Sequence, residues 1–204
     1  MFRLIVCLLF SSWSYANDTL AHKTLPEAQS FEDFLQDVRH QASAQGVSTA
    51  TLDLALSGLT PNPTVIKFDR TQAEFSQNFW KYLGSRVSNY RLKNGAEKLK
   101  QHQKVLQKNY QKYGVPPHII VAFWGLETNF GTYTGDLSLV RSLATLSYDQ
   151  RRRVFFTQQL LTLLGLIDSG KIPANAKGSW AGAMGNVQFM PTNVKAYGVD
   201  ANQD

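Results

Sequence analysis

The stretch PPHIIVAFWGLETNFG, residues 116–131, is the strongest indication of the fold class because its residues are typical of a helix that is apolar on every side. Its two prolines stand in a first helical turn, where a missing amide donor costs nothing, and Gly114 ends the segment before them. Residues 119–126 are all apolar apart from Gly125. Such a helix is typical of a protein interior. The stretch therefore predicts a buried helix that ends at an acidic residue, Glu127.

The segments on either side of this stretch also repeat at the helical period. Residues 31–46 have an apolar stripe at i, i+3, i+4 and i+7, and a short helix is predicted after Ser48 or Thr49. Residues 95–113 are predicted to form one amphipathic helix, and another is expected over about 153–168. No segment alternates at period two for long enough to predict a strand. The fold class is therefore all-α, or nearly so.

Charge is the next constraint on function. The 204-residue chain has 43% apolar residues, enough for a core, and a formal net charge of +6. A modest positive excess suits an anionic partner such as peptidoglycan, nucleic acid or a lipid surface. Four lysines recur at every fourth position of residues 95–113, namely Lys100, Lys104, Lys108 and Lys112. Without interleaved aromatic residues or a base-reading motif, this row indicates a solvated helix face and no nucleic-acid partner.

The first residues are typical of an export signal. Arg3 supplies the positive charge, residues 4–10 are apolar, and residues 14–16 offer a small-x-small cleavage site. The apolar run is too short for a bilayer span, which needs roughly 20 residues. We therefore predict a signal peptide at residues 1–16 and a mature protein in the periplasm.

Two other interpretations of this start remain open. Residues 1–16 could form a buried N-terminal helix, or the one cysteine, Cys7, could carry a lipid anchor. The lipid anchor is disfavoured because Val6 is bulky where a small residue is expected. The polar residues that follow, 17–30, have no periodicity and are predicted to be a linker.

Glu127 is the residue that carries the chemical information. On a helix its neighbours at i−4, i−3 and i+3 are aromatic, and apolar surroundings raise the pKa of a carboxyl group. A raised pKa is what a general acid needs near neutral pH. The alternative is a structural glutamate paired with Arg151 or Arg152, because buried carboxylates usually have cationic partners.

Several motifs in a fixed order favour the first interpretation. They are YGVPP at 113–117, ETNFG at 127–131, LATLSYD at 143–149, two arginines at 151–152, GSWAGAMG at 178–185 and QFMPT at 188–192. Together they resemble the lytic murein transglycosylase B family, strongly over about residues 110–200 and more loosely over 31–109. The resemblance implies one transglycosylase domain at 31–204. Within it, residues 110–204 would form a lysozyme-like core and 31–109 an additional N-terminal helical region.

The resemblance also implies a reaction. Glu127 matches the family's single catalytic carboxylate, which cleaves the β-1,4 bond between N-acetylmuramic acid and N-acetylglucosamine without water and leaves 1,6-anhydromuramyl ends. Ordinary glycosidases instead use two carboxylates. A hydrolytic, lysozyme-like muramidase that adds Asp136 or Asp149 therefore remains open, as does a peptidoglycan-binding module without catalysis.

Further residues are predicted to contact the substrate. Ser179 and Gln188 match family positions that line the cleft, although such side chains often bond local backbone instead. Aromatic rings could stack on sugars or belong to the core, and guanidinium groups could bind peptide or lactyl carboxylates or support the core. The predicted contact residues are Ser179, Gln188, Phe189, Arg151, Arg152 and Tyr148.

The last residues resemble the start of a calcium loop. Asp200, Asn202 and Asp204 occupy positions 1, 3 and 5 of an EF-hand-like sequence, but the glycine at 6 and the acidic residue at 12 are not in the chain. We therefore expect a truncated chain that binds calcium poorly. The chemistry itself is expected to need no cofactor. The expected partners are peptidoglycan glycan strands, with peripheral association with the cell envelope, and the chain is expected to be a monomer.

Overall fold

The computed structural model describes residues 29–71 and 78–199. The predicted signal peptide at 1–16, nearly all of the predicted linker, and the predicted calcium ligands Asp200, Asn202 and Asp204 lie outside the described residues.

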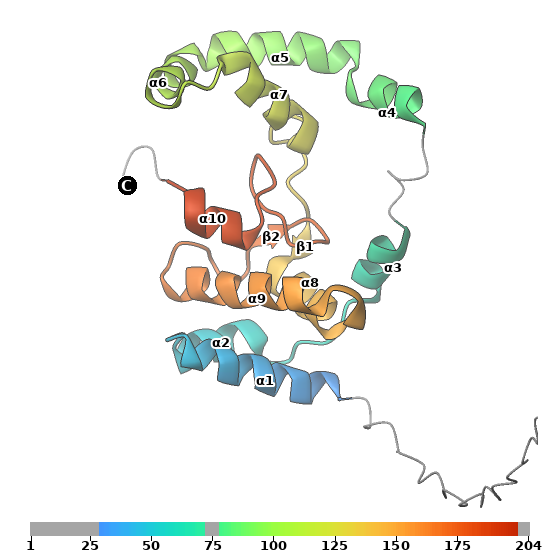
Figure 1. The fold of residues 1–204 in the computed structure, drawn as a ribbon, viewed down its shortest axis with the longest axis vertical. Helices are drawn as coiled ribbons and strands as arrows, with labels where there is room; N and C mark the ends of the chain where they lie inside the picture. The colour runs from blue at the N-terminus through green and yellow to red at the C-terminus, as the bar shows by residue number, and fades with distance from the viewer. Residues whose placement is uncertain (1–28, 72–77, 200–204) are drawn as a thin grey trace, which may run out of the picture.

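One group of helices carries the hydrophobic core (Figure 1). Helices α8 and α9 pack along each other, and α1, α2 and α10 pack on α9 while α3 packs on α8. The starts of α1 and α2 follow from local sequence, because the hydroxyl groups of Ser30 and Ser48 accept bonds from the amides of Asp33 and Thr51. The group consists of α1 Phe31–Ala44, α2 Thr49–Leu56, α3 Pro63–Thr71, α8 Leu139–Tyr148, the short 3₁₀ helix η2 Gln150–Arg152, α9 Arg153–Asp168 and α10 Pro191–Tyr197.

The core lies between these helices and draws on both ends of the chain. Leu143 of α8 and Leu160 of α9 are fully buried, and Val38 of α1 and Val65 of α3 pack with them. Burying one such side chain stabilises the fold by about 1.5–3 kcal/mol. The division of the domain between residues 109 and 110 stays a prediction. Helices α1–α3, which precede this boundary, pack directly on α8 and α9, which follow it.

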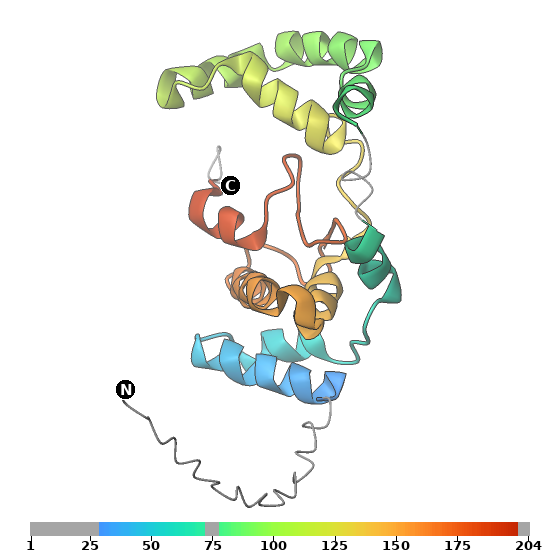
Figure 2. The same cartoon turned by 45° about the vertical axis from the view of Figure 1, so that its right-hand side comes forward.

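The second group of helices comprises α4 Phe79–Arg86, α5 Asn89–Gln101, α6 Gln103–Tyr113 and α7 Pro117–Thr128. Both views place it on the far side of α10 from α1 and α2 (Figures 1 and 2). Here the prediction of one continuous helix over 95–113 is wrong. The helix breaks at His102, whose backbone leaves helical geometry and whose ring lies edge-on to Trp124 of α7, with centroids 5.3 Å apart.

Helix α7 is less enclosed than its composition predicts. Its buried residues are Val121, Gly125 and Thr128, whereas the Phe123 side chain is 57% exposed and that of Leu126 is 43% exposed. The prediction of a helix buried on all sides is therefore wrong for the described residues. The reason is that, of the helices described, α5 and α6 pack along α7, and both lie on the same side of it.

Extended structure is minor in the part of the chain that the structure describes. The two-residue strand β1, Leu137–Ser138, pairs antiparallel with β2, Lys177–Gly178, so that Leu137 faces Gly178. This pairing joins the segment after α7 to the loop after α9. Because each of these strands has only two residues, the described structure supports the prediction of an all-α fold. None of the described helices is long and apolar enough to cross a membrane.

Candidate functional site

The ETNFG sequence forms a sharp end to α7. Asn129 and Phe130 both adopt left-handed backbone conformations, with φ values of 49° and 60°. Their amides turn back to donate to the carbonyls of Gly125 and Trp124, each at 3.2 Å. Left-handed geometry is costly for residues other than glycine and persists where surrounding contacts impose it. Glu127 is thereby held in the last turn of the helix.

The contact that imposes this geometry comes from the loop 178–190. The hydroxyl of Thr128 donates to the carbonyl of Asn186 at 2.8 Å and accepts from the amide of Gly131 at 3.0 Å. The indole Nε1 of Trp124 donates to Oδ1 of Asn186 at 3.1 Å. Thr128 is only 1% exposed, so these bonds are shielded from water. Asn186 was missed by the sequence analysis, although it stands between the two motifs at 178–185 and 188–192.

Phe130 explains why a glycine interrupts the apolar face of α7. Its ring folds under the helix, and a Cβ on Gly125 would lie 2.7 Å from its Cζ. A Cβ on Gly131 would lie 2.7 Å from Oδ1 of Asn186, in addition to the positive φ there. Each residue of the motif after Glu127 therefore has a structural role in placing that glutamate.

The surroundings of Glu127 differ from the prediction. Its side chain is exposed, so the described residues do not form the apolar enclosure that the flanking aromatic residues had predicted. The alternative of a structural ion pair is wrong as well, because Arg151 and Arg152 both bind Asp69. Within the described residues, no hydrogen bond or ion pair engages the Glu127 carboxylate. Among the described residues, Glu127 is therefore an exposed and unpaired carboxylate in the last turn of α7.

Ser179, Gln188 and Phe189 lie in the same loop that contacts α7. The Ser179 hydroxyl accepts from the amide of Ala183 at 3.0 Å, and Nε2 of Gln188 donates to the carbonyls of Thr134 and Gly185, each at 3.1 Å. Both side chains therefore form the bonds to nearby backbone that were expected as the alternative to glycan contacts. The bond to Thr134 ties this loop to the segment that follows Glu127. Phe189 is 37% exposed and forms a backbone bridge with Met184.

Arg151 and Arg152 belong to a separate group of charges, which we call the arginine cluster: Asp69, Arg70, Asp149, Arg151 and Arg152. Asp69 is buried and pairs with all three arginines. Burial acts to raise the pKa of Asp149, but the amide of Arg151 and the guanidinium group of Arg70 more than offset this and lower the pKa below its usual value. No hydrogen bond or ion pair among the described residues joins this cluster to the loop around Glu127.

Tyr148 lies beside the arginine cluster and packs with α1. Its hydroxyl donates to the carbonyl of Gln29 at 2.7 Å, and its ring lies edge-on to Phe31 with centroids 5.2 Å apart. The structure thus divides the six predicted contact residues into two sets. Ser179, Gln188 and Phe189 gather near the end of α7, whereas Tyr148, Arg151 and Arg152 lie at the junction of α8 and α9.

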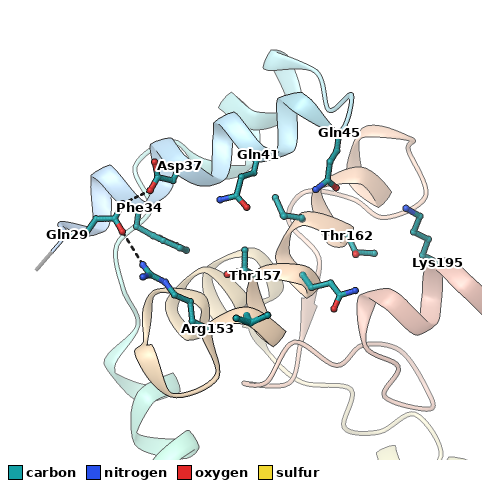
Figure 3. A pocket seen from close by; sticks show the side chains of 12 residues that line it. Gln29, Phe34, Asp37, Gln41, Gln45, Arg153, Thr157, Thr162 and Lys195 are labelled. Carbon is teal, nitrogen blue, oxygen red and sulfur yellow. Dashed lines mark hydrogen bonds between the residues drawn. The ribbon is translucent and has the colours of Figure 1, made fainter.

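Two cavities in the described residues are lined neither by Glu127 nor by any of the six predicted contact residues. A groove of about 730 Å³ lies between α1 and α9, and Figure 3 shows Gln29 bridging Asp37 and Arg153 across one end of it. An apolar cavity of about 310 Å³ lies between α5 and α7 and includes Leu126 and Phe130. In residues 29–71 and 78–199 no three His, Cys, Asp or Glu side chains gather as a metal site.

This architecture, a helical fold that presents one glutamate at the end of a helix, is that of lysozyme-like proteins. The chain belongs to the family described as Transglycosylase SLT domain, which matches residues 30–204. It is 43% identical over 115 residues to the membrane-bound lytic murein transglycosylase B of Escherichia coli strain K12, covering 55% of this chain and 32% of that protein. The predicted family resemblance is therefore confirmed.

Solved structures agree with this assignment. SltB3 from Pseudomonas aeruginosa in complex with NAG-NAM-pentapeptide matches with a TM-score of 0.82 and 42% identity, over 86% of this chain and 47% of that one. The Escherichia coli lytic transglycosylase Slt35 in complex with bulgecin A matches with a TM-score of 0.73 and 34% identity, over 84% and 56%. The predicted all-α, lysozyme-like class is confirmed. The chain spans about a third to a half of the length of these relatives.

Proposed function

We propose that the chain is the catalytic part of a peptidoglycan lytic transglycosylase, with Glu127 as its acid and base. The observation that carries the proposal is the state of Glu127 in the described structure. It is exposed in the last turn of a helix that two backbone hydrogen bonds cap, and the arginines that could have neutralised it are bound to Asp69 instead. Because the Glu127 carboxylate is exposed and unpaired among the described residues, it does not help to hold the described fold together, which supports a role in chemistry.

In the proposed reaction, Glu127 first acts as an acid. Its carboxylic acid proton passes to the bridging oxygen as the bond from C1 of N-acetylmuramic acid to that oxygen breaks, and the N-acetyl carbonyl of the same sugar stabilises the charge at C1. The Glu127 carboxylate then takes the proton of the C6 hydroxyl, whose oxygen bonds to C1 and closes the 1,6-anhydro ring. Glu127 ends protonated, as it began, and no water is consumed.

One carboxylate suffices for this sequence, and the positions of the others support it. Asp149 is bound by Arg70 at 2.7 Å and by the amide of Arg151 at 3.0 Å, and its lowered pKa makes it a weaker base for activating a water molecule. Asp136 is exposed in the segment between α7 and β1 and is the remaining carboxylate for the muramidase alternative. Replacing Asp136 by Asn is therefore expected to leave transglycosylase products unchanged.

Substrate contacts follow from the two sets of predicted residues. We assign glycan contacts to Ser179, Gln188 and Phe189, next to the end of α7, and contacts to carboxylates of the peptide to Arg151 and Arg152. We assign Tyr148, at the edge of the arginine cluster, as a further residue that contacts the substrate. SltB3 has been solved with NAG-NAM-pentapeptide and with NAG-anhNAM-pentapeptide, and ligands of this kind are the proposed substrate and product here.

The cellular setting belongs to the same proposal. Residues 1–16 would direct export to the periplasm, and the mature monomer would associate peripherally with the envelope. The chemistry requires no cofactor, because a carboxylic acid performs both proton transfers. Slt35 has been solved in complex with calcium, and a structural calcium ion in this chain would use Asp200, Asn202 and Asp204.

Mass spectrometry of the muropeptides released from isolated sacculi tests the function. Anhydromuramyl ends are expected, whereas reducing ends would indicate a muramidase and binding without products a non-catalytic module. Glu127→Gln is expected to lower product formation by about a hundredfold to ten-thousandfold, the usual contribution of a general acid or base. Glu97→Gln, an exposed glutamate of α5, is the matched control and should retain activity. Comparable turnover by Glu127→Gln and the wild type would remove Glu127 from this role.

A further inference from the structure

The carboxylate of Asp69 is the buried titratable group that the proposed reaction does not use. Its side chain is 2% exposed at the end of α3. A buried carboxylate is costly unless cations and hydrogen bonds compensate it. Here the compensation comes from three guanidinium groups, one adjacent in the chain and two that are 82 and 83 residues away.

The contacts with Arg151 have the geometry of a fork. Nε of Arg151 lies 3.1 Å from Oδ2 of Asp69 and its Nη2 lies 3.1 Å from Oδ1, while the same Nη2 also donates to the backbone carbonyl of Asp69 at 3.2 Å. Nη2 of Arg152 binds Oδ1, and its guanidinium group lies 4.8 Å above the centre of the Phe156 ring. Paired bonds of this kind fix orientation as well as distance.

Arg70 completes the cluster and defines its charge. Its Nη1 binds Oδ2 of Asp69 at 3.1 Å and its Nη2 binds Asp149 at 2.7 Å, so both of its terminal nitrogens are engaged. Three guanidinium groups face two carboxylates, and three minus two leaves one excess positive charge. That excess favours an anionic ligand.

Arg151 and Arg152 each keep one terminal nitrogen that is not engaged within the described residues. Nη1 of Arg151 and Nη1 of Arg152 take part in no hydrogen bond or ion pair within residues 29–71 and 78–199. The two side chains are also 44% and 39% exposed. Asp69 thus binds one edge of each guanidinium group from inside the protein, and the other edge is open to the solvent side.

We propose that Asp69 is a positioning residue that holds Arg151 and Arg152 as a preformed receptor for a carboxylate of the substrate's stem peptide. This inference rests on the proposed function, which assigns carboxylates of the peptide as the ligand of the two arginines. The carboxylate of Asp69 screens two guanidinium groups that would otherwise repel each other. It also restricts their rotamers before the substrate arrives, so less conformational entropy is lost on binding.

Calorimetric titration of the chain with two ligands tests this role. One ligand is NAG-NAM-pentapeptide with free carboxylates, and the other is its analogue in which every stem carboxylate is a carboxamide. The wild type is expected to bind the free acid about tenfold more tightly, a ratio that corresponds to about 1.4 kcal/mol. Asp69→Asn is expected to lose this preference while its affinity for the carboxamide ligand stays the same. An equal loss for both ligands would mean that Asp69 only supports the fold.

Two further variants complete the experiment. Asp53→Asn removes an exposed carboxylate that binds Arg39 on the α1–α2 face, and it should keep the preference of the wild type. Arg151→Lys keeps the charge but removes the fork, so it decides the question if Asp69→Asn fails to fold. The lysine variant is expected to lose most of the preference, and full retention would overturn the proposal. Because binding is measured without turnover, a chain that discriminates the ligands but releases no anhydro products would contradict the proposed function alone.

Discussion

Thr128→Val tests the two hydrogen bonds by which the Thr128 hydroxyl joins the end of α7 to the loop 178–190 and to Gly131. Valine keeps the shape of threonine and removes one hydroxyl, which donates to the carbonyl of Asn186 at 2.8 Å and accepts from the amide of Gly131 at 3.0 Å. Both of those backbone groups would lose a partner in a position that water reaches poorly, because Thr128 is 1% exposed.

The expected cost follows from these two bonds. Each contributes about 1 kcal/mol net, and a buried group left unpaired costs more than an exchanged bond, so the free energy of unfolding should fall by about 2–3 kcal/mol. The left-handed conformations of Asn129 and Phe130 would lose part of the support that imposes them. Glu127 would then be held less firmly, and product formation should fall with stability.

Urea denaturation followed by circular dichroism measures the stability change, and amide exchange at Gly131 reports the local opening. Thr132→Val is the matched control. Its hydroxyl donates to the carbonyl of Asn129 at 2.9 Å, but the side chain is exposed and water can replace the bond. The control should change the free energy of unfolding by less than about 0.5 kcal/mol. A Thr128→Val variant as stable as this control would show that the two hydrogen bonds of Thr128 do not stabilise the fold.

The remaining predictions concern one glycine and one ion pair. Gly125→Ala should destabilise the chain by about 1–3 kcal/mol because the new methyl group meets the Phe130 ring at 2.7 Å. Gly165→Ala in α9 is the control, because open space surrounds that position and alanine should stabilise the helix slightly. Thermal denaturation of both variants checks this, and an equal change in stability would contradict it. Because the pKa of Asp149 is lowered in the folded state, its contribution to stability is present above about pH 3.8 and is lost as the pH falls through the lower, folded value. Asp149→Asn should therefore be less stable than the wild type at pH 6 and approach it in strong acid, as measured by urea denaturation across that range, and a difference that does not change with pH would contradict this origin.

Part of the fold could be predicted because helices depend on local sequence. The bond from an amide to the carbonyl four residues earlier joins near neighbours, and caps such as Ser48 and Gly114 act within one turn. The position of Glu127 at the end of a helix followed from the same local rules. The motifs in their order were also enough to predict the family, which the comparison with known proteins confirmed.

Other features required the folded chain. Composition predicted that α7 would be buried on all sides, yet Phe123 is 57% and Leu126 43% exposed, because burial depends on which elements lie alongside a helix. The break at His102 coincides with its contact to Trp124, which no periodicity within 95–113 could indicate. Such contacts depend on packing between segments that are distant in sequence.

The site divides in the same way. The place of Glu127 in the last turn of a helix, just before Thr128 and Gly131, could be predicted because the end of a helix is set within a few residues. The folded chain was needed to show that Thr128 bonds to Asn186, 58 residues later, and that Arg151 bonds to Asp69, 82 residues earlier. Hydrogen bonds and ion pairs form wherever the packed helices bring the groups together, so their partners are a property of the whole fold.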